Sequence, residues 1–477
     1  MADSLKKQTK KGLYWKFAEQ FSKYGIQFII SIFMARLLSP SDYGITALPA
    51  VFMAVAGIFT EGGFAKALIR KKDLNEEDLS TAYIYSMCVG VLCYLILFFA
   101  SPWIADFYNT PVLKSLMRVT ALGFLYHPIG TPQNVLMQRN MNFKTIAKIS
   151  VFVSIIGGVV GIVLAFIGLG VWALVISGMV SDVVKQTLKI IAVRWYPKTG
   201  WSKKSFKYLW DYGNKMMASA LLDTLYTNIT PIFIGKYYST AQLGLYNRAR
   251  HYAQMPSKNV TGTLSSVTFP ALSKMQNDNE KLEKNYRKMI RVAAFIVFPM
   301  MIMLSALARP LVLIMISSKW ESCIILLQII CFSMMWYPIH ALNLNLLQVK
   351  GRSDLFLRLE VIKKITGGCI LAITLPLGLI PLCCGSILSS MISLIINTFY
   401  TGKIINCGYW KQMRDLAPTL MLSFVVWIVC QALLLLEVST WTQLLIGLFV
   451  GIGIYIGGAF IFKFPELKEV KYLLSKK

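Results

Sequence analysis

The sequence predicts an all-α polytopic membrane protein with fourteen transmembrane helices, arranged as two six-helix bundles and two additional C-terminal helices. Three observations support this fold class. The chain is 56% hydrophobic, whereas only 15% of its 477 residues are charged. About a quarter of the residues of a soluble domain are charged, so lipid is the expected surrounding of most of this chain. The other two observations are a series of long apolar segments and a polar pattern that recurs about 200 residues further along.

The apolar segments are long enough to cross a bilayer, which requires ~20 mainly apolar residues each. The first, seventh and eighth are more polar than the others. We count fourteen segments, at about 17–38, 45–69, 81–105, 115–137, 145–167, 170–192, 212–235, 243–272, 290–308, 321–347, 356–376, 380–402, 415–436 and 440–462.

The distribution of cations supports this count and its orientation. If the N-terminus is cytoplasmic, the inward connections carry most lysines and arginines, as at 70–72, 189–215, 274–291 and 403–414. The outward connections are short and hold few cations. This bias follows the positive-inside rule and explains the formal net charge of +27 without invoking nucleic acid. We therefore expect both termini to be cytoplasmic.

A repeat relates the two halves of the chain. A cation, a serine and a glycine recur at one spacing, each set directly after an apolar segment: Arg36, Ser39 and Gly44, then Lys236, Ser239 and Gly244. Further along, the segment 126–128 matches 336–338 around a proline. Each copy holds six spans, and an even number keeps both copies in the same orientation. This predicts a pseudo-twofold axis along the membrane normal, which is a common construction of secondary transporters.

The repeat sets the expected domain boundaries. We expect an N-terminal six-helix bundle at 1–193, an amphipathic cytoplasmic linker at 194–211 and a second six-helix bundle at 212–403. Residues 404–477 are expected to hold two further transmembrane helices and a basic cytoplasmic tail. The linker alternates lysines with aromatic residues, which is typical of a segment lying in the headgroup layer. Glycines in the fifth and last spans, including Gly158 and Gly451, should permit close helix packing.

Polar side chains inside the spans indicate a cavity, because a charge at the bilayer centre costs about 2.5–3.5 kcal/mol. In the first span Glu19, Lys23 and Gln27 are spaced four apart and so share one helix face. The 200-residue offset places Asp223 and Thr227 of the seventh span at the positions of Lys23 and Gln27. We interpret both stripes as facing a shared cavity. The alternative is that Glu19 and Lys23 form an i, i+4 pair at the cytoplasmic end.

The eighth span adds cations to the candidate cavity. Arg248 and Lys258 lie on or near one helix face, although Arg248 could also extend to the outer membrane surface. Glu61 in the second span is a further cavity candidate. The balance is basic, which favours an anionic substrate such as a phosphate. We interpret Asp182 and Lys185 in the sixth span as a structural ion pair. We interpret His127, beside a repeated proline, as a packing or kink residue, with a proton relay as the alternative.

Catalytic and metal chemistry are not expected. The nine cysteines lie mostly within apolar segments without metal-ligand spacing, so we expect buried free thiols. The sequence holds three histidines and lacks a phosphate-binding Gly-x4-Gly-Lys-Ser/Thr loop. We predict no catalytic residues, no metal, no cofactor and no enzyme activity.

Several motifs resemble polysaccharide exporters of the MOP flippase superfamily, in particular the Wzx-type O-antigen, colanic-acid and teichuronic-acid exporters. The motifs are the segments 35–44, 74–79, 245–249 and 269–273. The resemblance implies the MOP flippase fold, with a central cavity between the bundles and a groove for a polyprenyl tail beside the two extra helices. It further implies that Lys23, Arg248 and Lys258 bind a pyrophosphate, while Glu61 and Asp223 balance the site or carry a coupling proton.

The resemblance and the basic cavity together predict a flippase in the bacterial cytoplasmic membrane. Its substrate would be an undecaprenyl-pyrophosphate-linked oligosaccharide, such as an O-antigen or exopolysaccharide repeat unit, moved by alternating access. A small-molecule or drug cation antiporter of the same superfamily is the main alternative, but it would favour an acidic cavity. A polysaccharide polymerase or ligase is more distant, because such enzymes usually need a large outer domain. We expect a monomer whose partners are membrane lipid and polysaccharide export machinery, without nucleic acid.

Overall fold

A computed structural model describes residues 2–469 of the chain, with the backbone alone for 2–14, 16–18 and 21. The chain divides into two compact units, Met1–Gly244 and Leu245–Lys477, which we describe separately. Residues 470–477 of the expected basic tail lie outside the described residues.

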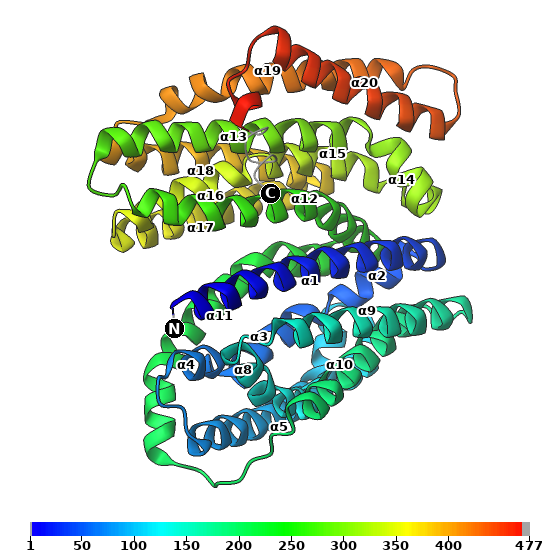
Figure 1. The fold of residues 1–477 in the computed structure, drawn as a ribbon. Helices are drawn as coiled ribbons and strands as arrows, with labels where there is room; N and C mark the ends of the chain where they lie inside the picture. Colours follow the sequence, from blue (N-terminus) through cyan, green and yellow to red (C-terminus); the bar gives the residue numbers. More distant parts are fainter. Residues whose placement is uncertain (1, 470–477) are drawn as a thin grey trace. The chain divides into compact units, whose positions relative to one another are not determined.

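Unit 1 contains the helices up to the start of α12 (Figure 1). They are α1 (Ala2–Leu37), α2 (Pro40–Ala47), α3 (Ala50–Glu61), α4 (Phe64–Arg70), α5 (Glu76–Phe107), α6 (Val112–Ala121), α7 (Gly123–Tyr126), the 3₁₀ turn η1 (His127–Gly130), α8 (Thr131–Arg139), α9 (Phe143–Phe166), α10 (Val171–Val193) and α11 (Lys203–Tyr237).

Helix α12 (Thr240–Ser273) crosses from unit 1 into unit 2. Unit 2 continues with α13 (Asn279–Ala306), α14 (Ala308–Ile316), η2 (Ser318–Trp320), α15 (Cys323–Met334), α16 (Tyr337–Val349), α17 (Ser353–Thr374), η3 (Leu375–Leu377), α18 (Leu379–Ile405), α19 (Tyr409–Leu433) and α20 (Thr440–Ile461).

The all-helical prediction is confirmed over residues 2–469, where no strand occurs. Nine stretches of this part are long and apolar enough to span a membrane, including α5, α9, α13 and α20. Four of the remaining expected spans are α1, α11, α12 and α17, which are long helices that carry more polar residues. The expected span 115–137 is instead broken into short helices around η1. A multi-pass membrane protein is shown, and the count of fourteen stays a prediction.

Glycines on α9 allow α1 and α10 to pack closely against it (Figure 1). A Cβ atom at Gly158 would overlap Ile30 of α1, and one at Gly157 would overlap Ser181 of α10. In unit 2, Gly451 of α20 similarly faces Cys430 of α19. The predicted packing role of these glycines is confirmed. Gly453, expected to act likewise, does not serve packing, because a Cβ atom added there would meet no atom within 4 Å.

The repeat is visible as equivalent local structure. Ser39 begins α2 with a capping box, in which its backbone N–H donates to Asp42 at 2.9 Å and its hydroxyl accepts from the Asp42 N–H at 3.2 Å. Ser239 does the same with Gln242 at the start of α12, at 3.1 and 3.2 Å. Both serines satisfy backbone donors that the first helical turn leaves open. The residues that recur in sequence therefore have one structural role in both copies.

The repeated glycines bring the starts of α2 and α12 into backbone contact within unit 1. A Cβ at Gly44 would fall onto the carbonyl oxygen of Thr240, and one at Gly244 would fall onto that of Pro40. The Ser41 and Thr240 hydroxyls also share a hydrogen bond of 2.8 Å. Because each glycine lies opposite the other copy's first turn, neither position accepts a side chain without backbone displacement.

The segment expected to be a surface linker packs partly into unit 1. Helix α11 begins at Lys203 and continues without interruption through the seventh expected span, packing against α3, α4 and α5. Trp195 is 7% exposed and its indole N–H donates to Glu76 at 2.8 Å. Phe206 packs against the buried Phe64. These contacts attach the segment to the helix bundle, whereas Tyr196 remains exposed.

Unit 2 is organised around α13, whose residues from Val292 to Ile302 are mostly buried. Helix α19 packs along α13, and α20 packs on α19 and α14 (Figure 1). At one end of this layer Arg287 of α13 binds Asp415 of α19 through two bonds of 2.7 and 2.8 Å. Arg291 binds Glu466 at 2.9 Å. The ion pairs join α13, α19 and the segment after α20.

All nine cysteines are free, as expected, but three of them are exposed rather than buried: Cys88, Cys369 and Cys384. These three lie on α5, α17 and α18, so the apolar segments of the sequence did not distinguish a buried from an exposed thiol. Cys407, between α18 and α19, is fully buried. Burial raises the pKa of this thiol to about 12, so it stays protonated and unreactive at neutral pH.

Candidate functional site

The polar face of α1 carries three candidate residues. Glu19 is half-buried and accepts a hydrogen bond of 2.7 Å from the Ser150 hydroxyl of α9. Lys23 is half-buried one turn further along, and Gln27 is exposed. In the described part of the chain Lys23 forms no ion pair with Glu19, so the alternative of an i, i+4 pair is not what the structure shows. Glu19 is engaged by the neighbouring helix through this hydrogen bond.

Three further candidates of unit 1 lie on α3 and α11. Glu61 is the last residue of α3 and is exposed. Asp223 and Thr227 are exposed on α11, where the Thr227 hydroxyl donates to the backbone carbonyl of Asp223. If α11 spans the membrane, as the sequence predicts, exposed polar groups near its middle require contact with water or with substrate. This arrangement is compatible with an aqueous cavity beside α11.

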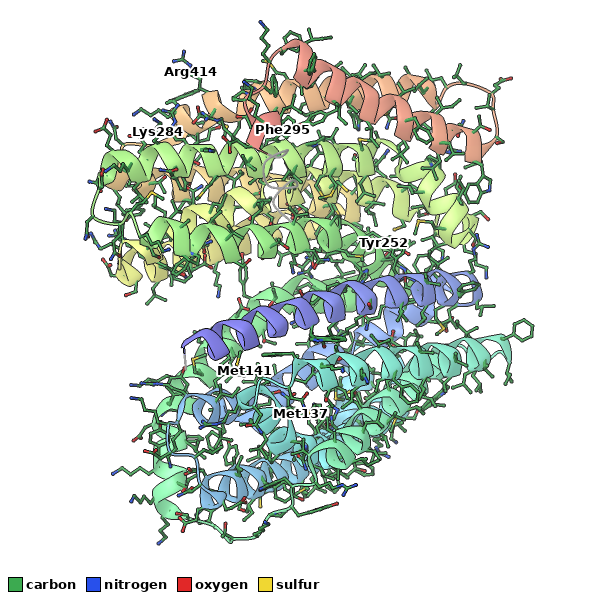
Figure 2. The ribbon with its side chains drawn as sticks, in the orientation of Figure 1. Met137, Met141, Tyr252, Lys284, Phe295 and Arg414 are labelled. Atoms are coloured by element: carbon green, nitrogen blue, oxygen red, sulfur yellow. The ribbon has the colours of Figure 1, made fainter. Side chains whose placement is uncertain are left out.

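The eighth expected span holds the two remaining cations. Arg248 is only 7% exposed, and its guanidinium lies 5.2 Å from the ring centroid of Tyr252 and 5.4 Å from that of Trp320. Tyr252 is labelled on α12 in Figure 2. Contact with the two aromatic rings attracts the guanidinium electrostatically and helps to fix its position. Lys258 lies on the same helix and is exposed.

The candidate residues thus fall into two groups. Glu19, Lys23, Gln27, Glu61, Asp223 and Thr227 belong to unit 1, and Arg248 and Lys258 belong to unit 2. Within unit 1 they are spread over three helices. Their joint role in substrate binding stays a prediction. No cluster of three or more His, Cys, Asp or Glu side chains that could hold a metal occurs in residues 2–469.

Unit 2 contains an apolar groove of about 650 Å³ between α13, α14 and α20. Its walls are formed by hydrocarbon side chains, among them Met303, Leu307 and Leu448. Tyr455 also lines the groove, but its hydroxyl donates to the Phe295 carbonyl at 2.8 Å and is therefore satisfied. Phe295 is labelled beside this region in Figure 2. A surface of this kind fits an alkyl or prenyl chain and offers nothing to a polar ligand.

One pair of ionisable residues differs from the sequence interpretation. Asp182 lies 3.3 Å from His127, and no ion pair with Lys185 within 4 Å occurs in the part of the chain that the structure describes. The predicted Asp182–Lys185 pair is therefore not a direct contact: Asp182 of α10 contacts His127 of η1, and Lys185 acts on its carboxylate electrostatically from more than 4 Å. The sequence offered one signal for the pairing of Asp182 with His127: both residues are ionisable and lie in the middle of expected spans.

Comparison with known proteins assigns the chain to a family. The family described as "Polysaccharide biosynthesis protein" matches residues 33–325, which is more than half of the chain. The protein belongs to the polysaccharide biosynthesis protein family. The match includes α2 to α14 and both copies of the repeated capping motif. The resemblance drawn from the sequence motifs is thereby confirmed.

Curated relatives of this polysaccharide biosynthesis protein cover most of its length. It is 26% identical over 360 residues to the teichuronic acid biosynthesis protein TuaB of Bacillus subtilis, a match covering 74% of this chain and 73% of TuaB. It is 24% identical over 447 residues to the lipopolysaccharide biosynthesis protein WzxC of Escherichia coli, covering 89% of each. A match of 25% identity covers 66% of this chain and 64% of the succinoglycan biosynthesis transport protein ExoT of Rhizobium meliloti.

Solved structures confirm the fold. The lipid II flippase MurJ in an inward closed conformation aligns with a TM-score of 0.75 at 15% identity, over 94% of this chain and 98% of MurJ. A multidrug resistance MATE transporter of the MOP superfamily aligns with a TM-score of 0.60 at 14% identity, over 81% and 96%. These neighbours confirm the MOP-type fold. The relatives support a transporter and not an enzyme, as predicted.

Proposed function

We propose that this protein is a flippase for a polyprenyl-pyrophosphate-linked oligosaccharide in the bacterial cytoplasmic membrane. It would act by alternating access, as a monomer with cytoplasmic termini. The lipid tail stays in the bilayer while the sugar and pyrophosphate cross in water. This division of the substrate avoids moving a charged pyrophosphate through hydrocarbon.

The apolar groove between α13, α14 and α20 is the observation that carries the proposal. A small cation needs no such surface, whereas a polyprenyl chain needs an extended apolar surface beside the site that binds its head group. The groove volume of about 650 Å³ accommodates part of such a chain. Membership of the polysaccharide biosynthesis protein family and the names of its relatives support an oligosaccharide as the attached cargo.

The cations supply the head-group site. Lys23 lies half-buried on α1, and the Arg248 guanidinium on α12 stacks on Tyr252 and Trp320. Charge-assisted hydrogen bonds from such groups to phosphate oxygens are among the strongest polar contacts in proteins. Lys258 is a third donor. Gln27 and Thr227 offer neutral hydrogen bonds to sugar hydroxyls, while Glu61 and Asp223 balance the positive charge or carry a coupling proton.

Removing either main cation should abolish most of the transport. We expect Lys23→Ala and Arg248→Ala each to slow the flipping of a fluorescent undecaprenyl-pyrophosphate oligosaccharide by about tenfold or more in proteoliposomes, because each removes a charge-assisted contact of ~1.5–3 kcal/mol. Lys204→Ala is the matched control, since Lys204 is an exposed cation at the start of α11 outside the proposed cavity. Full activity of both cavity variants would remove these residues from the site.

Filling the groove should reduce transport without affecting the cationic residues. We expect Leu448→Trp to lower the flipping rate severalfold, because the indole occupies volume that the prenyl chain needs. Ile461→Trp on the same helix is the control, since Ile461 is 74% exposed and does not line the groove. Equal rates for the two tryptophan variants would show that the groove does not hold the lipid tail.

A further inference from the structure

An ion pair lies at the centre of a membrane-spanning helix in unit 1. Asp182 is the middle residue of α10, which is long and apolar enough to cross the membrane. Its carboxylate lies 3.3 Å from Nε2 of His127, the first residue of the turn that interrupts the neighbouring segment. Ionisable residues at this depth are rare outside ion paths and proton relays.

We propose that His127 and Asp182 form a proton-binding site that couples translocation to a proton gradient. This inference rests on the proposed transport function, and it names a coupling site separate from the polar faces of α1, α11 and α12. The ligand is a proton taken from water.

The pair is accessible from outside the protein packing. The side chains of His127 and Asp182 are 44% and 39% exposed. A charged pair directed into hydrocarbon is unfavourable, so the open side of this pair borders water. Lys185 and Lys189 follow Asp182 along α10 at helical spacing and interact with its carboxylate electrostatically. Asp182, Lys185 and Lys189 together form a row of charged side chains from the centre of α10 towards its end at Val193.

The elements packed around η1 are α5, α7, α8 and α10. Helix α7 contributes the phenol of Tyr126, which interacts with Asp182. Helix α5 contributes Gly90, where an added Cβ atom would meet the Phe124 carbonyl and Pro128. The charged residues of α5 are confined to its two ends.

Helix α8 brings two polar side chains that are already engaged. Gln133 donates to the Trp195 carbonyl at 3.1 Å, and Arg139 donates to backbone carbonyls that include Leu68 at 2.9 Å. Among the described residues, the ionisable groups besides His127 that interact electrostatically with Asp182 are Tyr126, Lys185 and Lys189.

These surroundings allow one proton to bind and leave. In the neutral ring, an Nε2–H directed at Asp182 leaves the Nδ1 lone pair to accept a proton from water. The resulting imidazolium is compensated by the Asp182 carboxylate. When the proton returns to water, the carboxylate stays compensated by Lys185 and Lys189. Neither state contains an isolated buried charge, which would be strongly disfavoured.

The first test follows protonation directly and needs no transport. The chain has three histidines, so ¹⁵N-histidine labelling of the detergent-solubilised protein gives the signals of three imidazole rings. The signals that disappear in His127→Gln belong to His127. We expect the His127 signal to respond to pH, and Asp182→Asn to change that response, because the carboxylate that lies 3.3 Å from the ring is lost. A His127 signal that does not titrate, or that is indifferent to Asp182→Asn, would overturn the proposal.

The second test uses proteoliposomes with a pH gradient and the fluorescent undecaprenyl-pyrophosphate oligosaccharide. Native flipping should depend on the gradient, and Asp182→Asn should lose this dependence. Glu360→Gln is the matched control, since it removes an ion pair to Lys363 at 2.5 Å within α17. A variant that keeps the native gradient dependence would overturn coupling at this pair. Absence of flipping by the native chain contradicts the proposed function instead, and the histidine titration then decides the proton site alone.

Discussion

Gly44→Ala should destabilise the protein strongly. The added Cβ would fall onto the Thr240 carbonyl oxygen, and backbone atoms cannot rotate aside as a side-chain end can. Overpacking of this kind costs about 1–3 kcal/mol and occasionally more, and we expect the upper part of that range. The measurement is the thermal unfolding midpoint of the purified protein in detergent, together with its membrane yield.

Two companion variants make this result specific. Gly178→Ala in α10 has no atom within 4 Å of the new methyl group and should leave the midpoint unchanged or raise it. Gly244→Ala should match Gly44→Ala, because its methyl group would meet the Pro40 carbonyl from the other side of the same crossing. The double variant should be destabilised by less than the sum of the two single variants, since one backbone displacement relieves both overlaps. A Gly44→Ala midpoint equal to that of Gly178→Ala would contradict the close crossing of α2 and α12.

Asp415→Ala should give the second large effect on stability. The Asp415 side chain is 7% exposed and accepts two hydrogen bonds from Arg287. A guanidinium nitrogen of Arg291 also lies 3.7 Å from the Asp415 carboxylate. Without the carboxylate, Arg287 keeps only the more distant Glu283 at 3.9 Å, whereas Arg291 keeps Glu466 at 2.9 Å. Removing one partner of a buried pair costs about 3–5 kcal/mol, and we expect ~2 kcal/mol for this pair because both arginines are one-third exposed and so partly screened.

The unfolding midpoint again provides the measurement, and an exposed pair provides the control. Arg352 and Asp354 are bonded at 2.8 Å but are 50% and 62% exposed, so Asp354→Ala should leave the midpoint unchanged. Figure 2 shows Lys284 and Arg414 at the same end of unit 2, where cations are frequent. Equal midpoints for the Asp415 and Asp354 variants would show that the α13–α19 ion pairs do not hold this end together.

Much of the fold was predictable because local chemistry recurs in the sequence. The serines at 39 and 239 have acceptor-bearing residues three positions later, which is the pattern of a capping box, and the structure shows that box in both copies. Gly44 and Gly244 were identified as repeated residues from sequence alone. Their mutual approach was not predictable, because spacing along the chain does not reveal which helix crosses which.

The candidate site was predictable in its residue types but not in its contacts. Helical periodicity placed Glu19 and Lys23 on one face correctly, yet it favoured a contact within α1 as strongly as one outside it. The structure pairs Glu19 with Ser150 of α9. The pairing of Asp182 with His127 was missed for the same reason: sequence neighbours such as Lys185 are visible in a helical pattern, whereas partners from another element depend on tertiary packing.

The central claim concerns the class of substrate, and one measurement on the native chain tests it. Proteoliposomes containing the protein should flip a fluorescent undecaprenyl-pyrophosphate oligosaccharide and should not move a small organic cation such as ethidium. A flipping rate well above that of empty liposomes, without cation transport, is the result that this account predicts. Cation transport without flipping of the lipid-linked oligosaccharide would contradict it and would identify the protein as an antiporter with the same fold.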